Sequence, residues 1–425
     1  MKTKKIFYFL VFIISLFVIS SQLTTLFNNG IEVESISLKN SKHESWTKIW
    51  IGDTSSQGQN VVLDSKGNII VHGSYGNGNI LIKYNDSGEE LWNFRYEAKG
   101  EIPFPGSRTV PTVDKTHIWS VGPHGDMYCF DKSTGLPVWN HNLLEEFDRE
   151  LTTWGVSQAP LIYQDLAIVA PQGLRAGVAA FKKTTGELIW SSPPLNGRPF
   201  HVSPSLASFG GVDQVVMISP YDREDSTRIH QVVSLDAQSG KLLWKYEGLK
   251  SFATITPAMA IDDQRLFLTD CSYNGQYGPV SIMLEITREG GDFKVKELFL
   301  TEEAGSKMHP AVQFENHLYL NHTGNPNQMM CLSLDGNVLW EKGAAPGFEL
   351  GGMILVDGLI INQNGKNGDI HLIQPSPNGY MELGKASFFS SRKSQAWAPL
   401  AFSQGKLIVR DLEKMVCVDL QILAE

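Results

Sequence analysis

The feature that most constrains the fold is a short motif that recurs along the chain, in which a turn glycine stands four residues before a tryptophan. In Met127–Trp139, an apolar run leads into Asp131–Gly135, and a second apolar run then ends in the indole. Asp, Ser, Thr and Gly favour tight turns, so each copy predicts two strands joined by a hairpin. The five copies pair Gly88 with Trp92, Gly135 with Trp139, Gly186 with Trp190, Gly240 with Trp244, and Gly336 with Trp340.

The copies recur at a nearly constant spacing. Successive tryptophans lie 47, 51, 54 and 96 residues apart, and the last interval is two periods of 48. Dividing residues 44–419 by a period of 47 gives eight units. Repeated units stack around one continuous core. The sequence therefore predicts a single domain over residues 44–425, and not the roughly three domains that length alone would suggest.

The two chain ends predict how the stack of units closes. The last unit, Ala396–Leu420, has three strand-like runs and lacks the fourth, whereas Trp46–Ile51 looks like a strand without a preceding partner. Pairing that strand with Met415–Leu420 leaves no open sheet edge. We therefore predict an all-β, eight-bladed β-propeller of four-stranded antiparallel blades, with the ring closed by an N-terminal strand that completes the last blade.

The repeated residues are expected to be architectural. A proline opens the first strand of most units, where no ladder hydrogen bond is lost. The turn aspartates are expected to accept hydrogen bonds from turn amides, the glycines to take a positive φ, and the tryptophans to fill the wedge between blades. The fifth unit matches the motif least well, and there Phe299 occupies approximately the position of the repeated tryptophan. The prolines are Pro111, Pro160, Pro204, Pro257, Pro310 and Pro399, and the aspartates are Asp131, Asp236 and Asp335.

The cysteines follow the same repeat. Cys129, Cys331 and Cys417 hold equivalent places in their units. Stacked blades keep equivalent positions farther apart than the ~4.4–6.8 Å between Cα atoms that a disulfide needs. We predict buried, unpaired thiols.

The N-terminal segment predicts export. Met1–Lys5 carries three lysines, and Ile6–Ile19 is almost uninterrupted apolar sequence followed by serines. This is the pattern of a signal peptide over residues 1–20, with residues 21–43 as a lead-in linker. The alternative is an uncleaved anchor over residues 6–27, which has the roughly 20 residues that span a bilayer. Either way the folded part is expected outside the cytoplasm, periplasmic or secreted. The first cysteine is Cys129, so no N-terminal lipid anchor is expected.

The charge of the chain argues against one class of partner. The formal net charge is −9, and no run of Lys or Arg occurs outside the extreme N-terminus. A surface that binds phosphates needs clustered positive charge. We expect no nucleic-acid partner, and membrane contact only through an uncleaved N-terminal segment.

The motif Asp-x-x-Thr-Gly-x-x-x-Trp, as in Asp131–Trp139, resembles the repeat of quinoprotein-like (PQQ-like) β-propellers over roughly Trp46 to Leu420. That family includes quinoprotein alcohol dehydrogenases and the outer-membrane barrel-assembly lipoproteins. The runs 122–127, 154–161 and 397–400 are most similar to a bacterial extracytoplasmic subgroup. The resemblance implies the propeller fold, and fold alone does not fix function.

For the dehydrogenases the resemblance implies PQQ, a disulfide between adjacent cysteines, and an Asp base beside a Ca²⁺ held by Glu and Asn. This chain has no adjacent cysteines, and no motif places the other residues. We expect no cofactor, no metal and no catalytic residue. PQQ with Ca²⁺ is expected only if the protein is an atypical dehydrogenase.

If the mouth of the central channel binds a ligand, the lining comes from residues just before the first strand of each blade. Polar groups among aromatics are typical of a small-molecule site. The alternative is a water-filled funnel. The candidates are Arg108, Trp154, Gln158, His201, Thr254, His309 and Trp397.

Two kinds of candidate have a definite chemistry. His201 and His309 could face each other across the channel and bind a metal or move protons, but their neighbours lack metal-ligand spacing, and we expect polar lining. Arg108 could pair with an anion, either a quinone carboxylate or an acidic peptide, or be neutralised by an acid of a neighbouring blade.

The leading functional hypothesis is a non-catalytic extracytoplasmic propeller that binds a protein, peptide or glycan partner on one face. Exposed outer strands could capture an extended peptide by strand addition. The alternative is a PQQ-dependent alcohol or sugar dehydrogenase with an atypical site at the central channel.

Overall fold

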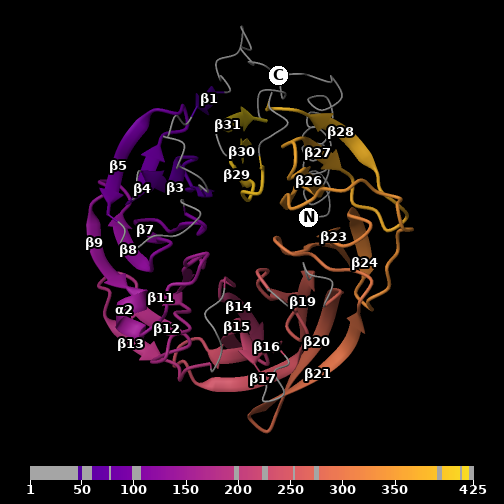
Figure 1. The fold of residues 1–425 in the computed structure, drawn as a ribbon, viewed down its shortest axis with the longest axis horizontal. Coiled ribbons are helices and arrows are strands. Elements are labelled where there is room, and N and C mark those ends of the chain that lie inside the picture. Colours follow the sequence, from indigo (N-terminus) through magenta and orange to yellow (C-terminus); the bar gives the residue numbers. More distant parts are fainter. Residues whose placement is uncertain are drawn as a thin grey trace, which may run out of the picture.

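Eight small antiparallel sheets stand around a ring in the computed structural model, with the first strands nearest the centre and the fourth at the rim (Figure 1). The predicted propeller is confirmed. The predicted signal segment and lead-in lie outside the described residues. The structure describes residues 46–49, 60–75, 78–97, 107–195, 201–222, 228–251, 254–271, 277–389, 395–411 and 414–420.

The blades follow one another along the chain, and each is a meander of short strands. Blades one to four comprise β2 (Asn60–Leu63), β3 (Ile69–Tyr75), β4 (Gly78–Tyr84) and β5 (Glu90–Tyr96); β6 (Thr112–Val113), β7 (His117–Val121), β8 (Asp126–Asp131) and β9 (Pro137–Asn142); β10 (Leu161–Tyr163), β11 (Leu166–Val169), β12 (Ala179–Lys182) and β13 (Leu188–Ser191); and β14 (Ser205–Phe209), β15 (Val212–Asp222), β16 (Arg228–Asp236) and β17 (Leu242–Leu249). Blades five to eight comprise β18 (Met259–Ala260), β19 (Arg265–Cys271), β20 (Pro279–Glu289) and β21 (Asp292–Thr301); β22 (Val312–Phe314), β23 (His317–His322) and β24 (Gln328–Ser333); β25 (Met353–Val356), β26 (Leu359–Gln363), β27 (Ile370–Ile373) and β28 (Glu382–Ala386); and β29 (Ala401–Ser403), β30 (Lys406–Arg410) and β31 (Lys414–Asp419) together with β1 (Trp46–Ile49).

The ring closes as the sequence predicts. The N-terminal strand β1 pairs antiparallel with β31, with Trp46 opposite Cys417 and Ile49 opposite Lys414. The strand order of the last blade is β1-β31-β30-β29, and Figure 1 shows β1 beside β31. Strands from both chain ends therefore share one blade.

Blade six departs from the regular pattern, because its fourth strand is reduced to a single bridge between Leu332 and Val338. The chain after the bridge covers the edge of β24 as a loop instead. Met329 donates its backbone N–H to the Pro346 oxygen at 2.9 Å, and Gly343 donates to Gln328 Oε1 at 2.5 Å. The Met329 N–H and the Gln328 side chain at this edge thus find hydrogen-bond partners without a regular fourth strand.

At four seams the repeated aromatic packs on the turn glycine of the next blade. A Cβ built on Gly135 would lie 2.4 Å from Cδ2 of Trp92, and the Trp92 indole donates to the Lys132 oxygen at 3.2 Å. The predicted wedge role of the tryptophans is confirmed at this seam. The same packing joins Trp139 to Gly186, Trp190 to Gly240, and Phe299 to Gly336.

The turn aspartates act as expected at two of the three positions. Asp131 accepts hydrogen bonds from the Ser133 hydroxyl and from the amides of Ser133 and Thr134, and these bonds lower its pKa to about 2. Asp236 likewise accepts from the backbone N–H groups two and three residues on. The prediction is wrong for Asp335. There Ser333 Oγ is the acceptor, because the hairpin is one residue shorter and its glycine N–H bonds to the Ser333 oxygen.

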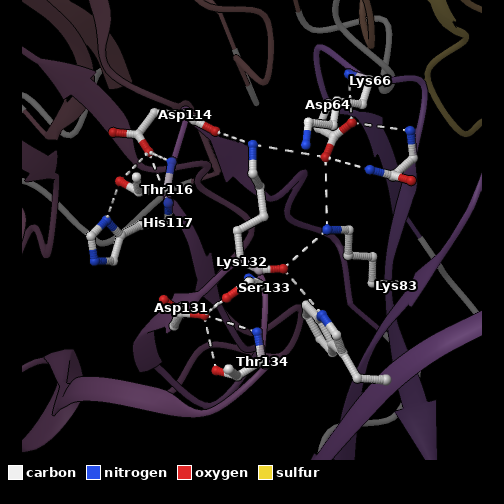
Figure 2. Close-up of polar contacts among 12 residues, drawn as sticks. Asp64, Lys66, Lys83, Asp114, Thr116, His117, Asp131, Lys132, Ser133 and Thr134 are labelled. Atoms are coloured by element: carbon white, nitrogen blue, oxygen red, sulfur yellow. Dashed lines mark hydrogen bonds and ion pairs between the residues drawn. The ribbon is translucent and has the colours of Figure 1, made fainter.

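A buried network of charges ties blade one to blade two (Figure 2). Asp64, 2% exposed, has its Oδ2 3.8 Å from the ammonium groups of both Lys83 and Lys132. Lys132 also donates to the Asp114 oxygen at 2.7 Å. Burial would raise the pKa of Asp64, but hydrogen bonds led by that from Asn68 outweigh burial and hold the pKa below its usual value. The seam is therefore polar as well as apolar.

Cys129, Cys331 and Cys417 are buried and unpaired, as predicted, and so is Cys271. Burial raises the pKa of Cys129 to about 12, so the thiol is inert at neutral pH. The short helix α2 (Leu143–Phe147) follows β9 and is capped by the Asn142 side chain. Within the described ranges, no helix has both the length and the apolar character needed to span a bilayer.

Candidate functional site

The predicted channel residues all lie at one end of the blades. In an antiparallel meander, the start of the first strand, the end of the second and the start of the third share one face. We call the face on which β6, β10, β14, β18, β22 and β29 begin the entry face. The seven candidates precede these strands, and their contacts divide them into separate groups.

Arg108 and Trp154 form the most exposed group. The Arg108 guanidinium donates from Nη1 to the Trp154 oxygen at 2.9 Å, and its carbon lies 6.0 Å from the centroid of the Trp154 ring. Trp154 is 48% exposed, although large aromatic rings are usually buried. Burial lowers the pKa of Arg108 from its ordinary value. The pair offers a positive charge beside an accessible aromatic face.

His201 lies within the field of two arginines. Its Nδ1 is 2.7 Å from Ser157 Oγ, which joins the segments leading into blades three and four. Burial, and then the positive charges of Arg149 and Arg108, lower the pKa of His201 to about 4. The imidazole is therefore neutral at pH 7. We call Arg108, Arg149, Trp154, Ser157 and His201 the arginine cluster.

Arg149 is a residue that sequence reasoning missed. It is 6% exposed, and its Nη1 donates to the Pro171 oxygen at 3.0 Å. Its Nε and Nη2 are also buried and find no hydrogen-bond partner in the part of the chain that the structure describes. Burial lowers the pKa of Arg149 to about 10. The run Glu145–Glu150 looks like a solvated charged segment, so nothing in the sequence marks this side chain as buried.

Gln158 and Thr254 are buried, with 2% and 0% of their surface exposed. Thr254 Oγ1 lies 3.5 Å from Oδ2 of Asp270, a second residue that the sequence did not single out. Asp270 is 1% exposed, and burial raises its pKa to about 7, against the opposing charge of Lys307. Its Oδ1 has no partner among the described residues. Blade five thus carries a buried carboxyl at the entry face.

His309 lies apart from the arginine cluster, between blades six and seven. A Cβ on Gly352 would lie 3.1 Å from Cε1 of His309, so the ring packs against the start of blade seven. Burial lowers its pKa to about 4, and the backbone of Leu350 and Trp397 acts in the other direction. Trp397 is 37% exposed. His309 and His201 therefore contact different blades. Among the residues that the structure describes, no three His, Cys, Asp or Glu side chains gather to hold a metal ion.

A second surface runs around the rim. In five blades, the residue just before the repeated aromatic is an aliphatic side chain that faces solvent; in four of them it lies on the outer strand, and in blade six it follows the single bridge. The aromatic beside it packs on the next blade, as strand alternation requires. We call these five the rim residues: Leu91 (50% exposed), Val138 (47%), Ile189 (46%), Leu298 (40%) and Leu339 (38%).

The rim is hollowed between blades five and six. An open hollow of roughly 420 Å³ lies there, lined by the end of β21 and by the hairpin that follows β24. The lining residues are Phe299, Leu300, Thr301, Glu303, Asp335, Gly336, Asn337 and Val338. The hollow therefore lies beside the rim residues Leu298 and Leu339.

Comparison with known proteins agrees with this architecture. Residues 76–342 match the family model described as outer membrane protein assembly factor BamB. No curated protein matches the chain in sequence.

Among solved structures, BamB from Moraxella catarrhalis superposes with a TM-score of 0.53 at 13% identity, covering 89% of this chain and 96% of that one. Quinohemoprotein alcohol dehydrogenase from Comamonas testosteroni gives 0.57 at 13%, covering 88% and 76%. The computationally designed Ika8 protein gives 0.52 at 11%, covering 87% and 98%. At these identities the likeness concerns the fold alone, and the predicted PQQ-like propeller is confirmed.

Proposed function

Because the chain belongs to the family of the outer membrane protein assembly factor BamB, we propose that it is a non-catalytic propeller that works outside the cytoplasm and binds a protein or peptide partner. The extracytoplasmic setting rests on the signal-like pattern of Met1–Ile19 and on the name of the family. A glycan remains within the class of partners that the sequence suggests. The finer assignment, an extended peptide, is argued from the rim.

The observation that carries the proposal is the ring of rim residues. Four of them lie on the outermost strands β5, β9, β13 and β21, whose outer edges pair with no further strand in their sheets within the described residues, and Leu339 follows the single bridge of blade six. An extended peptide can add to such an edge, with backbone hydrogen bonds giving affinity and alternate side chains giving selectivity. Exposed aliphatic residues at one repeated position supply the apolar contacts that strand addition needs.

The residues do not fit a quinoprotein site. The four cysteines are separate in sequence and buried as unpaired thiols. No metal-ligating group of three His, Cys, Asp or Glu is found among residues that the structure describes. Asp131 and Asp236 are engaged in turns, and Trp92, Trp139 and Trp190 in seams between blades. We therefore derive no catalytic step through PQQ or Ca²⁺.

A second candidate function is a PQQ-dependent dehydrogenase with an atypical site. The specific observation in its favour is the carboxyl of Asp270 at the entry face, whose pKa burial raises to about 7, within the range of a general base. The fold likeness to a quinohemoprotein alcohol dehydrogenase adds no residue to that site.

Peptide binding tests the leading proposal. Purified protein would be titrated against a panel of fluorescein-labelled peptides that alternate Thr with Val or Ile, with fluorescence anisotropy as the readout. We expect the double variant Val138→Lys, Ile189→Lys to bind about tenfold more weakly, about 1.4 kcal/mol, because two ammonium groups replace apolar contacts. Its melting temperature should not change, since both side chains already face solvent.

The matched control is Leu174→Lys, which changes a leucine that is 76% exposed but lies outside the rim. This variant should bind like the wild type. If no peptide of the panel binds, or if the rim variant binds as tightly as the control, the rim is not the binding surface and the proposal is wrong.

A further inference from the structure

The arginine cluster has a feature that neither the repeat nor the rim explains. We propose that it is a carboxylate-binding site, in which the Nε and Nη2 groups of Arg149 hold the two oxygens of the ligand. The site lies on the entry face, so it goes beyond the proposed rim function and is tested separately from it.

The geometry of the Arg149 side chain defines the ligand. Its Nη1 is already occupied by the Pro171 oxygen at 3.0 Å. In a guanidinium, Nη1 lies on the Cδ side, so Nε and Nη2 point the same way and form one edge. Two parallel N–H donors along that edge match the two oxygens of a carboxylate. This edge is the part of Arg149 that is buried without a partner in the described residues.

Unpaired donors on a buried cation are costly, and native structures normally satisfy them. Burial alone lowers the pKa of Arg149 to about 10, so the side chain keeps its charge at pH 7 without a stabilising acid. An anionic ligand would remove both penalties at once.

The surroundings of Arg149 add positive charge. Both Arg149 and Arg108 act on His201, which stays neutral with Ser157 Oγ 2.7 Å from its Nδ1. The cluster thus gathers two guanidinium groups around a neutral imidazole. Such a site attracts a negative ligand and repels a cation.

The fork of Arg149 is held in place by the local backbone. Arg149 follows the left-handed cap of α2 at Asp148 (φ 51°), and its N–H donates to the Leu144 oxygen at 3.0 Å. The loop of blade three that carries Pro171 packs so closely on α2 that a Cβ on Gly173 would lie 2.1 Å from the Phe147 oxygen. A donor pair fixed this way binds with little loss of side-chain entropy.

Trp154 and Arg108 would contact the part of the ligand beyond its carboxylate. The Trp154 ring is 48% exposed, with the Arg108 guanidinium 6.0 Å from its centroid. A ligand anchored by its carboxylate would meet an aromatic and cationic wall at the entry face. The carboxylate can come from a small organic acid or from an acidic side chain of a peptide, and the recognising chemistry is the same.

The experiment is isothermal titration of the purified protein with three probes: succinate, an acetylated and amidated Asp-Asp peptide, and inorganic phosphate. The informative variant is Arg149→Lys, because an ammonium can still donate to the Pro171 oxygen but cannot offer two parallel donors. We expect wild type to bind a carboxylate probe, and Arg149→Lys to bind it at least about tenfold more weakly. Arg175→Gln is the control, since Arg175 is exposed and belongs to the same loop of blade three.

Tighter binding of succinate would identify a small organic acid as the ligand class, and tighter binding of the Asp-Asp peptide would identify an acidic peptide. Either result supports the site. Equal affinity in wild type and Arg149→Lys, no binding of either carboxylate, or phosphate binding tighter than both would overturn it. If Arg149→Lys has a lower melting temperature than wild type, Arg108→Gln provides the second test, with weaker carboxylate binding expected and unchanged binding contradicting the site.

Discussion

At the scale of single residues, the turn glycine Gly135 meets two separate demands. Gly135 has φ +73°, which L side chains rarely adopt, and the Trp92 ring occupies the space that a Cβ would need. Gly290, in the hairpin of blade five, has φ +61° but nothing within 4 Å of an added Cβ. The two positions allow backbone strain to be measured apart from contact between blades.

We expect Gly135→Ala to destabilise the protein by about 2–4 kcal/mol and Gly290→Ala by about 1–2 kcal/mol. Both variants carry the cost of the left-handed backbone, and only the first pushes a methyl group into a tryptophan. Urea unfolding followed by circular dichroism gives both values. An equal decrease in the free energy of unfolding in the two variants would mean that the Trp92 ring moves aside at no cost and that the seam does not depend on Gly135.

Asp270 makes stability depend on pH. Its pKa rises from 3.8 to about 7 on folding because the carboxyl is buried, so folding favours the protonated form. The stability that the neutral carboxyl contributes is fully present below about pH 4 and is lost as the pH rises to about 7. At ~1.4 kcal/mol per pKa unit, the loss is at most about 4 kcal/mol.

The variant Asp270→Asn removes this titration. We expect it to gain stability relative to wild type between pH 5 and pH 8, measured as the free energy of unfolding in urea at each pH. Lys307 lowers the carboxyl's pKa, so Lys307→Met should raise that pKa further and extend the loss of stability to higher pH. Wild type and Asp270→Asn curves that run parallel from pH 5 to pH 8 would contradict a buried, protonated Asp270.

At the scale of elements, the strand β1 closes the ring, and its register can be trapped chemically. Trp46 lies directly opposite Cys417, and opposed residues of antiparallel strands have Cα atoms about 4.5–5.5 Å apart, within the range for a disulfide. We expect Trp46→Cys to form an internal disulfide with Cys417 on mild oxidation, detected by mass spectrometry of a proteolytic digest.

The control for this crosslink is Lys48→Cys, which faces Met415 and has no thiol opposite it. Its oxidised digest should contain no link to Cys417. If Trp46→Cys gives no link either, or if both variants do, β1 does not hold the register that closes the ring.

The sequence predicts the elements well where a local pattern repeats. The hairpins, the closing strand and the role of Phe299 in blade five all follow from position within the repeat. Two details could not be predicted, since they depend on the length of a turn and on the path of the chain after it. One is Ser333 replacing Asp335 as the acceptor, and the other is the loop after Trp340 that covers β24 in place of a fourth strand.

At the scale of the whole molecule, the candidate site was only partly predictable. Position before a first strand puts Arg108 and Trp154 on one face, whereas their mutual contact could not be read from the sequence. Arg149 and Asp270 were missed because their burial arises from other blades: Arg149 is covered by the loop that carries Pro171, and Asp270 sits beside Thr254 and Lys307. The repeat motif predicts the strands and turns within a unit, and it does not predict which side chains are buried by contacts with another unit.

The architecture also explains why function should lie outside the turn and seam residues of the repeated motif. The motif's acids and glycines are engaged in turns, and its tryptophans in the seams between blades. What remains for a partner is the rim, where Leu91 and Val138 face solvent, and the entry face, where Arg149 and Trp154 lie. The central proposal is that these two surfaces bind a partner and that the protein works without a quinone cofactor.

The most direct test of that claim is to add PQQ and Ca²⁺ to the purified protein and to follow its melting temperature together with dye reduction in the presence of alcohols and sugars. We predict no shift in melting temperature that requires both PQQ and Ca²⁺, and no dye reduction, because the chain has no adjacent cysteines and its described residues include no cluster of three His, Cys, Asp or Glu side chains. A melting shift that needs both additions, accompanied by substrate-dependent dye reduction, would contradict the account.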